Sequence, residues 1–124
     1  MERDLTLIRE LLLYVEATCE GGEIKRLDYE HFKSFDQKMV YGHERLLREK
    51  GLLRNGSQRI GMLISLYGLT WEGHDFLDSI RNPEVWRKTK EATNKVGGWT
   101  LEFVGEIAKG FFKTQIEKHT GVEL

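Results

Sequence analysis

Histidine, cysteine and glycine are the residues of this sequence that would carry chemistry if their spacing were right. His74 stands next to Asp75, and a neutral histidine with a carboxylate can act as a general base. Adjacent residues on a helix point about 100° apart, so these two side chains do not face each other. We therefore expect His74 to cap or pack near a hairpin, and we expect no catalysis from the pair.

Metal and phosphate sites are not predicted either. The four histidines show no ligand spacing, and a single cysteine, Cys19, argues against a structural zinc site. Neither Gly21-Gly22 nor Gly97-Gly98 is followed by the lysine and hydroxyl residue of a phosphate-binding loop. The sequence thus predicts a protein that is not an enzyme and has no cofactor or metal.

The composition restricts the kinds of partner that we expect and the cellular compartment in which we expect the protein. The 124 residues carry 19 Lys and Arg against 20 Asp and Glu, a net charge of −1, so bulk charge does not favour nucleic acid. One cysteine fits a reducing compartment, and no apolar run approaches the ~20 residues that cross a bilayer. The Met-Glu-Arg-Asp start is unlike a signal peptide. We expect a cytoplasmic protein with no membrane partner.

A local basic patch is the best candidate for function, and it lies on a predicted helix and hairpin. Between Arg45 and Arg59 there are five basic residues and one acid. Asp36 can cap a helix that ends before Gly51. Asn55-Gly56 is a strong hairpin signal between strands at residues 52–54 and 60–66. Thr70 then begins a helix that reaches Ile80.

The flanking residues complete a winged helix-turn-helix. Apolar spacing predicts a helix over residues 4–19, a strand at 24–27 and a short helix capped by Asp28. In winged helices a strand in the position of 24–27 often pairs with the wing. Asn82-Pro83 starts another helix, and an apolar helix follows from Thr100 to about His119. We predict a mainly α fold with a small antiparallel β-wing, made of a winged helix-turn-helix core at residues 1–81 and a C-terminal helical extension at 82–124.

In such a fold the recognition helix meets the major groove of duplex DNA and the wing meets the adjacent backbone. The candidate DNA-binding residues are Gln37, Lys38, His43, Arg45, Arg48, Arg54 and Arg59. The alternative is that these are solvated surface charges. A winged helix can also bind protein, and an exposed Met39, Tyr41 or Trp71 would suit that use.

The apolar C-terminal helix needs a partner surface. A homodimer through residues 100–119 would place two recognition helices about one DNA turn apart. Packing within the chain is the equal alternative.

Two family resemblances support this fold. Arg45 to Leu53, followed by Leu69-Thr70-x-x-Gly73-x-x-Phe76-Leu77, resembles bacterial winged-helix regulators of the MarR and PadR type. Nearly the whole chain, including Met1 to Arg9 and Leu69 to Trp86, resembles a family of small uncharacterised proteins of bacterial genomes and prophages. The resemblance implies a winged-helix fold and a mobile-element context, and it transfers no functional residues.

The expectation is therefore a small winged-helix DNA-binding regulatory protein, of prophage or mobile-element origin. The alternative is a non-enzymatic protein-interaction module on the same fold, such as a phage factor that binds or inhibits a host complex.

Overall fold

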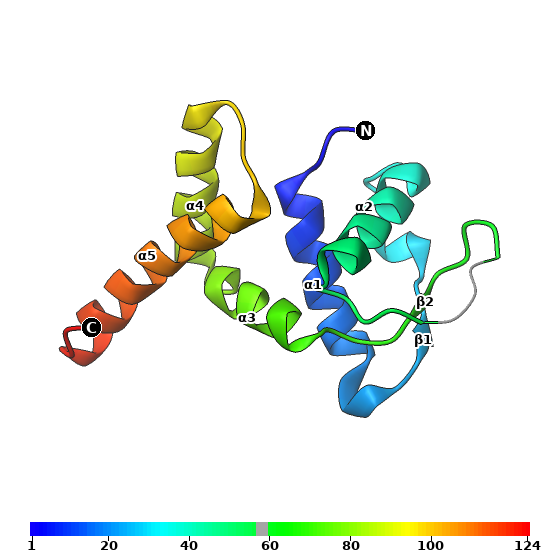
Figure 1. Cartoon of the computed structure of the whole chain (residues 1–124), viewed down its shortest axis with the longest axis horizontal. Coiled ribbons are helices and arrows are strands. Elements are labelled where there is room, and N and C mark those ends of the chain that lie inside the picture. The colour runs from blue at the N-terminus through cyan, green and yellow to red at the C-terminus, as the bar shows by residue number, and fades with distance from the viewer. Residues whose placement is uncertain (57–59) are drawn as a thin grey trace. The chain divides into compact units, whose positions relative to one another are not determined.

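A computed structural model describes residues 1–56 and 60–124 of the chain. These residues form a mainly helical structure with a small two-stranded antiparallel sheet (Figure 1). They fold as two compact units, Met1–His74 and Asp75–Leu124. The helices are α1 (Leu5–Thr18), α2 (Gln37–Lys50), α3 (Trp71–Ile80), α4 (Pro83–Val96) and α5 (Leu101–Thr120), with short 3₁₀ turns η1 (Glu20–Gly22) and η2 (Tyr29–Phe32) and strands β1 (Lys25–Arg26) and β2 (Ser65–Leu66).

The first unit begins with two capped helices that pack on each other. The Asp4 carboxylate accepts from the Leu7 N–H at the start of α1, and the Asp36 carboxylate accepts from the Lys38 N–H at the start of α2. Gly51 ends α2 in the left-handed conformation with φ 85°, which glycine adopts without strain. These helices and the short η2 turn after Asp28 confirm the sequence prediction.

The predicted pairing of residues 52–54 with residues 60–66 was wrong. Residues 52–54 join the returning chain through one bridge, Leu53 to Leu69, and through a hydrogen bond from the Arg54 N–H to the Gly68 carbonyl. β2 pairs with β1, which agrees with the expectation that the strand at residues 24–27 pairs with the wing; Lys25 lies opposite Leu66 and Arg26 opposite Ser65. Residues 60–66 do not run as one strand, because the chain turns back at Gly61, where φ is 57° and Ile60 bridges to Leu63.

The start of α3 is held against the end of α2. The Thr70 hydroxyl accepts from the Gly73 N–H and donates to the Gly51 carbonyl. Gly73 has no room for a side chain, since a Cβ there would overlap the Leu52 carbonyl oxygen. That oxygen belongs to backbone that also accepts from the Thr70 N–H, so it cannot move aside easily.

Replacing Gly73 therefore tests this close approach. We expect Gly73→Ala to lower the free energy of unfolding by about 2 kcal/mol or more, because backbone must shift. Gly110→Ala is the matched control: a Cβ at this helical position meets nothing, and the change should stabilise the fold by about 0.5–1 kcal/mol. Urea unfolding of both variants measures the difference, and equal effects would contradict the packing at Gly73.

The second unit pairs α4 with α5. The Asn82 side chain caps α4 ahead of Pro83, and the Thr100 hydroxyl caps α5, as the sequence predicts. Val85 and Trp86 of α4 and Leu101, Val104 and Ala108 of α5 are buried. Beyond Ala108, α5 has no buried residue. Within the described residues, no helix is both long and apolar enough to span a membrane.

Candidate nucleic-acid interface

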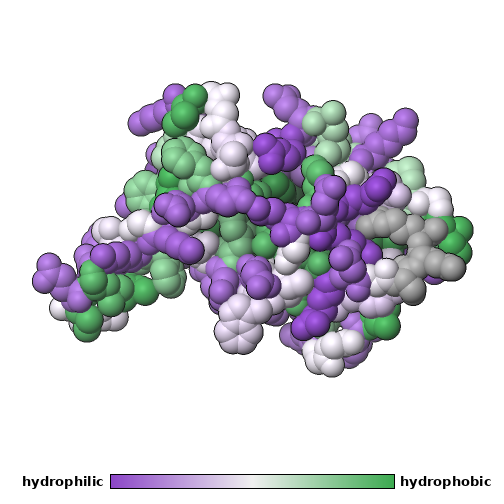
Figure 2. All heavy atoms as spheres, in the orientation of Figure 1, coloured by the Kyte–Doolittle hydropathy of each residue, from purple (hydrophilic) through white to green (hydrophobic). Residues whose placement is uncertain are grey.

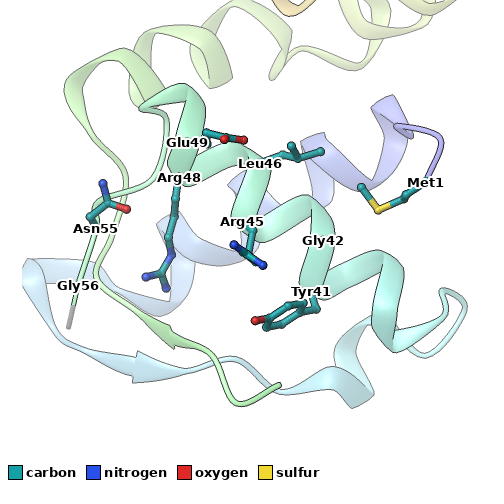
Figure 3. Close-up of a pocket in the computed structure, with 9 residues that line it drawn as sticks. All are labelled: Met1, Tyr41, Gly42, Arg45, Leu46, Arg48, Glu49, Asn55 and Gly56. Carbon is teal, nitrogen blue, oxygen red and sulfur yellow. The ribbon is translucent and has the colours of Figure 1, made fainter. Parts of the chain in front are cut away.

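The outer face of α2 and the chain just after it enclose a trough of about 590 Å³ (Figure 3). Its lining comes from α2, from Met1 and from the chain after α2, and includes Tyr41, Arg45, Arg48, Glu49, Asn55 and Gly56. Figure 3 shows the Arg45 and Tyr41 side chains on the side of α2 that faces the trough. This trough is where the helix and the predicted wing come together.

The opposite face of α2 determines which side chains reach the trough. Val40, His43, Glu44 and Leu47 are buried at three- and four-residue spacing, which is one side of a helix. Two of these residues are polar, so their burial requires partners.

Glu44 finds its partner in Arg48 one turn later. The Arg48 Nε donates to the Glu44 carboxylate, and the Arg48 Nη2 donates to the Ser65 carbonyl of β2. The guanidinium also lies 5.8 Å from the centre of the Tyr67 ring. Glu44 is 0% exposed and Arg48 8%, so this ion pair fastens α2 to β2 from inside the fold.

His43 is likewise a structural residue. Its Nε2 accepts from the Asp4 N–H at 2.8 Å, and its Nδ1 lies 2.8 Å from the Met39 carbonyl. Since Nε2 accepts, Nδ1 carries the proton and donates to that carbonyl. The ring is 1% exposed and joins the N-terminal segment to α2.

The structure places two of the predicted DNA-binding residues inside the fold. His43 and Arg48 are buried and hold α2 through the hydrogen bonds described above, and the Arg48 side chain also lines the trough. Gln37, Lys38, Arg45 and Arg54 are exposed. Arg59 lies outside the described residues.

The exposed cations differ in the contacts that hold their side chains. The Arg45 guanidinium lies 5.9 Å from the centre of the Tyr41 ring, within cation–π range. The Arg54 Nε donates to the Leu69 carbonyl at 3.2 Å, which holds the base of its side chain. Sequence reasoning missed two residues that line the trough, Glu49 and Asn55. Glu49 lies one helical turn after the predicted Arg45, and Asn55 directly follows the predicted Arg54.

A second groove, of about 480 Å³, lies at the C-terminal end of α1, beside η1. Cys19 and Arg54 line it, as does His74, whose Nδ1 is 3.6 Å from a Glu16 carboxylate oxygen. Burial raises the pKa of the Cys19 thiol, whose Sγ contacts the Leu66 carbonyl at 3.6 Å. Among the described residues, no group of three His, Cys, Asp or Glu is placed to hold a metal ion.

Comparison with known proteins gives the family. Residues 2–99 match the family described as "Hypothetical protein (DUF2513)". The chain belongs to this family. A relative from Haemophilus influenzae, described as "Uncharacterized protein", is 35% identical over 114 residues, which cover 88% of this chain and 93% of the relative. No solved structure matches the chain significantly. The predicted membership in a family of uncharacterised bacterial proteins is confirmed, and these matches bring no activity with them.

The buried ion pair gives a prediction about stability. Glu44→Ala leaves the Arg48 charge buried without its carboxylate, so we expect the free energy of unfolding to fall by about 3–5 kcal/mol. Glu49→Ala, on the exposed side of the same helix, should change it by less than about 0.5 kcal/mol. Urea unfolding measures both.

A second pair of substitutions separates charge from packing. Glu44→Leu with Arg48→Met removes both charges and keeps apolar volume, and should cost less than Glu44→Ala alone. If the double variant were less stable than Glu44→Ala, this result would contradict the buried pairing of the two charges.

The Cys19 thiol gives a prediction about reactivity. Because burial raises its pKa and covers the thiol, the native chain should react with iodoacetamide at pH 8 more slowly than the urea-unfolded chain. The neutral thiol should also stabilise the fold below the pKa of an unfolded cysteine, roughly 8.5, and this contribution should disappear as pH rises through the higher native pKa. Equal labelling rates in the two states would contradict the burial.

Proposed function

We propose that this chain is a winged helix-turn-helix protein that binds duplex DNA as a regulator, with α2 as the recognition helix. Three features support the assignment. The short η2 turn precedes α2 as the first helix of a helix-turn-helix does. β1 and β2 form a small antiparallel sheet beside α2, and residues 60–65 form a turn next to this sheet that would be part of a wing (Figure 1).

The trough is the observation that carries the proposal. In a winged helix bound to DNA, the recognition helix lies in the major groove and the wing meets the backbone or minor groove alongside. One phosphodiester strand must then pass between the two elements. The trough lies between α2 and Asn55-Gly56, and Arg45 is one of the residues that line it.

The charges fit a small number of phosphate contacts. Lys38, Arg45 and Arg54 are the exposed cations among the predicted contacts, and Arg45 lines the trough. Asp36 and Glu49 are acids at the start and near the end of the same helix. With about three phosphates neutralised, the logarithm of affinity should fall with the logarithm of salt at a slope of about −3. Gln37 and Tyr41 would be nearest the base edges.

A protein partner is the second candidate, favoured by Trp71. This side chain is 78% exposed at the start of α3, and tryptophan is a preferred anchor at protein interfaces. Under this reading the chain is an interaction module, such as a phage factor that acts on a host complex.

The proposed regulator would bind as a homodimer through residues 100–119. Phe103 and Phe112 are exposed on α5 and supply apolar surface for a second copy. Sedimentation at several concentrations tests this assembly separately from DNA binding.

Salt-dependent binding of variants at the exposed predicted contacts tests the DNA proposal. The probe is a duplex selected by the wild-type chain from a random pool, read by fluorescence anisotropy. Lys38→Ala with Arg45→Ala and Arg54→Ala should weaken binding at least about 30-fold and reduce the salt slope by about 3. Lys113→Ala on α5 is the matched control and should leave both unchanged.

Two results would overturn the proposal. Selection could recover no duplex above background, or the triple variant could bind as the wild type does. Pull-down from bacterial lysate with and without nuclease identifies the alternative, which predicts a protein captured in both cases and lost in Trp71→Ala.

A further inference from the structure

The loop that follows the trough has one face turned outward. Ile64 and Leu66 are buried at 0% and 1%, while Leu63 is 47% exposed and Ser65 and Tyr67 are half-buried. Successive side chains of an extended chain point to opposite faces, so Leu63, Ser65 and Tyr67 share the outward face. This face runs along the loop from Tyr67 at its base to Leu63 near its tip.

This outward face is continuous with the trough. Arg48, which lines the trough, donates to the Ser65 carbonyl and lies over the Tyr67 ring. Gly56, at the opposite wall, packs so closely on the Tyr67 ring that a Cβ would overlap it. Arg26 pairs with Ser65 across the sheet and is exposed, so it adds a cation to the same face.

The tip of this face is apolar. Ile60 and Leu63 form an antiparallel bridge, with the Leu63 N–H donating to the Ile60 carbonyl at 3.0 Å. Bridge partners project to the same side of a strand pair, so the two side chains stand together. Ile60 is 73% exposed, and Figure 2 shows hydrophobic atoms on the outer edge of this loop.

The tip is also held in place from below. The Tyr29 hydroxyl donates to the Met62 carbonyl at 2.6 Å, which ties the turn to η2. Gly61, with φ 57°, allows the tight reversal. The pair is therefore presented to solvent on a braced turn.

We infer that Ile60 and Leu63 form an apolar wedge that enters the DNA minor groove and partly unstacks one base step. The inference rests on the proposed function. If one phosphodiester strand lies in the trough, with α2 in the major groove on one side of it, the loop tip faces the minor groove on the other side. Isoleucine and leucine are side chains that architectural proteins insert between base steps, kinking the duplex by about 20–90°.

Duplex bending tests the wedge. The probe is a duplex of about 20 base pairs, selected by the wild-type chain, with donor and acceptor dyes at its ends, since a kink shortens the distance between them. Wild-type protein should raise energy transfer. Ile60→Ser with Leu63→Ser should bind about 3- to 30-fold more weakly and abolish the rise. Val96→Ser, a control at an exposed apolar residue of the other unit, should change neither.

The outcomes separate the wedge from the proposed function. Binding without bending by the wild type, or equal bending by the double variant, would overturn the wedge and leave DNA binding intact. A wild type that selects no duplex would overturn both. Sedimentation provides a third result: a dimeric wild type and a monomeric double variant would assign the tip to a second copy of the chain and overturn the wedge. Thermal unfolding confirms that each variant is folded.

Discussion

The buried Glu44–Arg48 pair is the constraint on which the rest of the first unit depends. Moving two charges out of water costs several kcal/mol for each ion, and such a pair is tolerated when geometry and further hydrogen bonds offset that cost. Here the guanidinium satisfies Glu44 and the Ser65 carbonyl at once. Because both bonds are directional, they fix the rotation of α2 about its own axis and its position along β2.

The fixed rotation of α2 determines which of its side chains face outward. With Glu44 and Arg48 turned inward, Arg45 and Glu49, which follow each of them by one residue, are turned outward. His43 adds a second fixed point, because its ring accepts from the Asp4 N–H and so holds the beginning of α1 near α2. Buried polar side chains, and not apolar packing alone, therefore position the residues that line the trough.

The sequence predicted the elements that local chemistry determines and missed what depends on distant contacts. Asp4, Asp36, Asn82 and Thr100 cap their helices as expected, because a cap needs only the next few residues. The pairing of the strand at 24–27 with the chain after the hairpin turn was expected, but its register could not be read from the sequence, since β1 and β2 lie about forty residues apart. Nor could Asn55-Gly56 show that the chain would turn again at Gly61.

The two predicted contacts that lie inside the fold, His43 and Arg48, show which signal was overlooked. Counting cations between Arg45 and Arg59 treats all sides of a helix alike, whereas the spacing of Val40, Glu44 and Leu47 marks the inward side. Glu44 and Arg48 stand four residues apart, the spacing of an ion pair on one helix face, and that pairing could have removed Arg48 from the candidates. His43 gave no comparable signal, because its partner is a backbone N–H of another helix cap.

The near-neutral charge restricts how such a protein would recognise DNA. A chain with 19 cations and 20 anions gains little from counterion release, so a few phosphate contacts alone give weak and salt-sensitive binding. Selectivity must then come from contacts that do not depend on net charge. An apolar tip that unstacks a base step has this property, because the cost of the deformation depends on the step and is lowest at flexible pyrimidine–purine steps. A protein built in this way would discriminate among sequences more by how readily they kink than by hydrogen bonds to their base edges. That expectation agrees with an α2 face on which Tyr41 and Met39 occupy positions where several small polar side chains would otherwise read the groove.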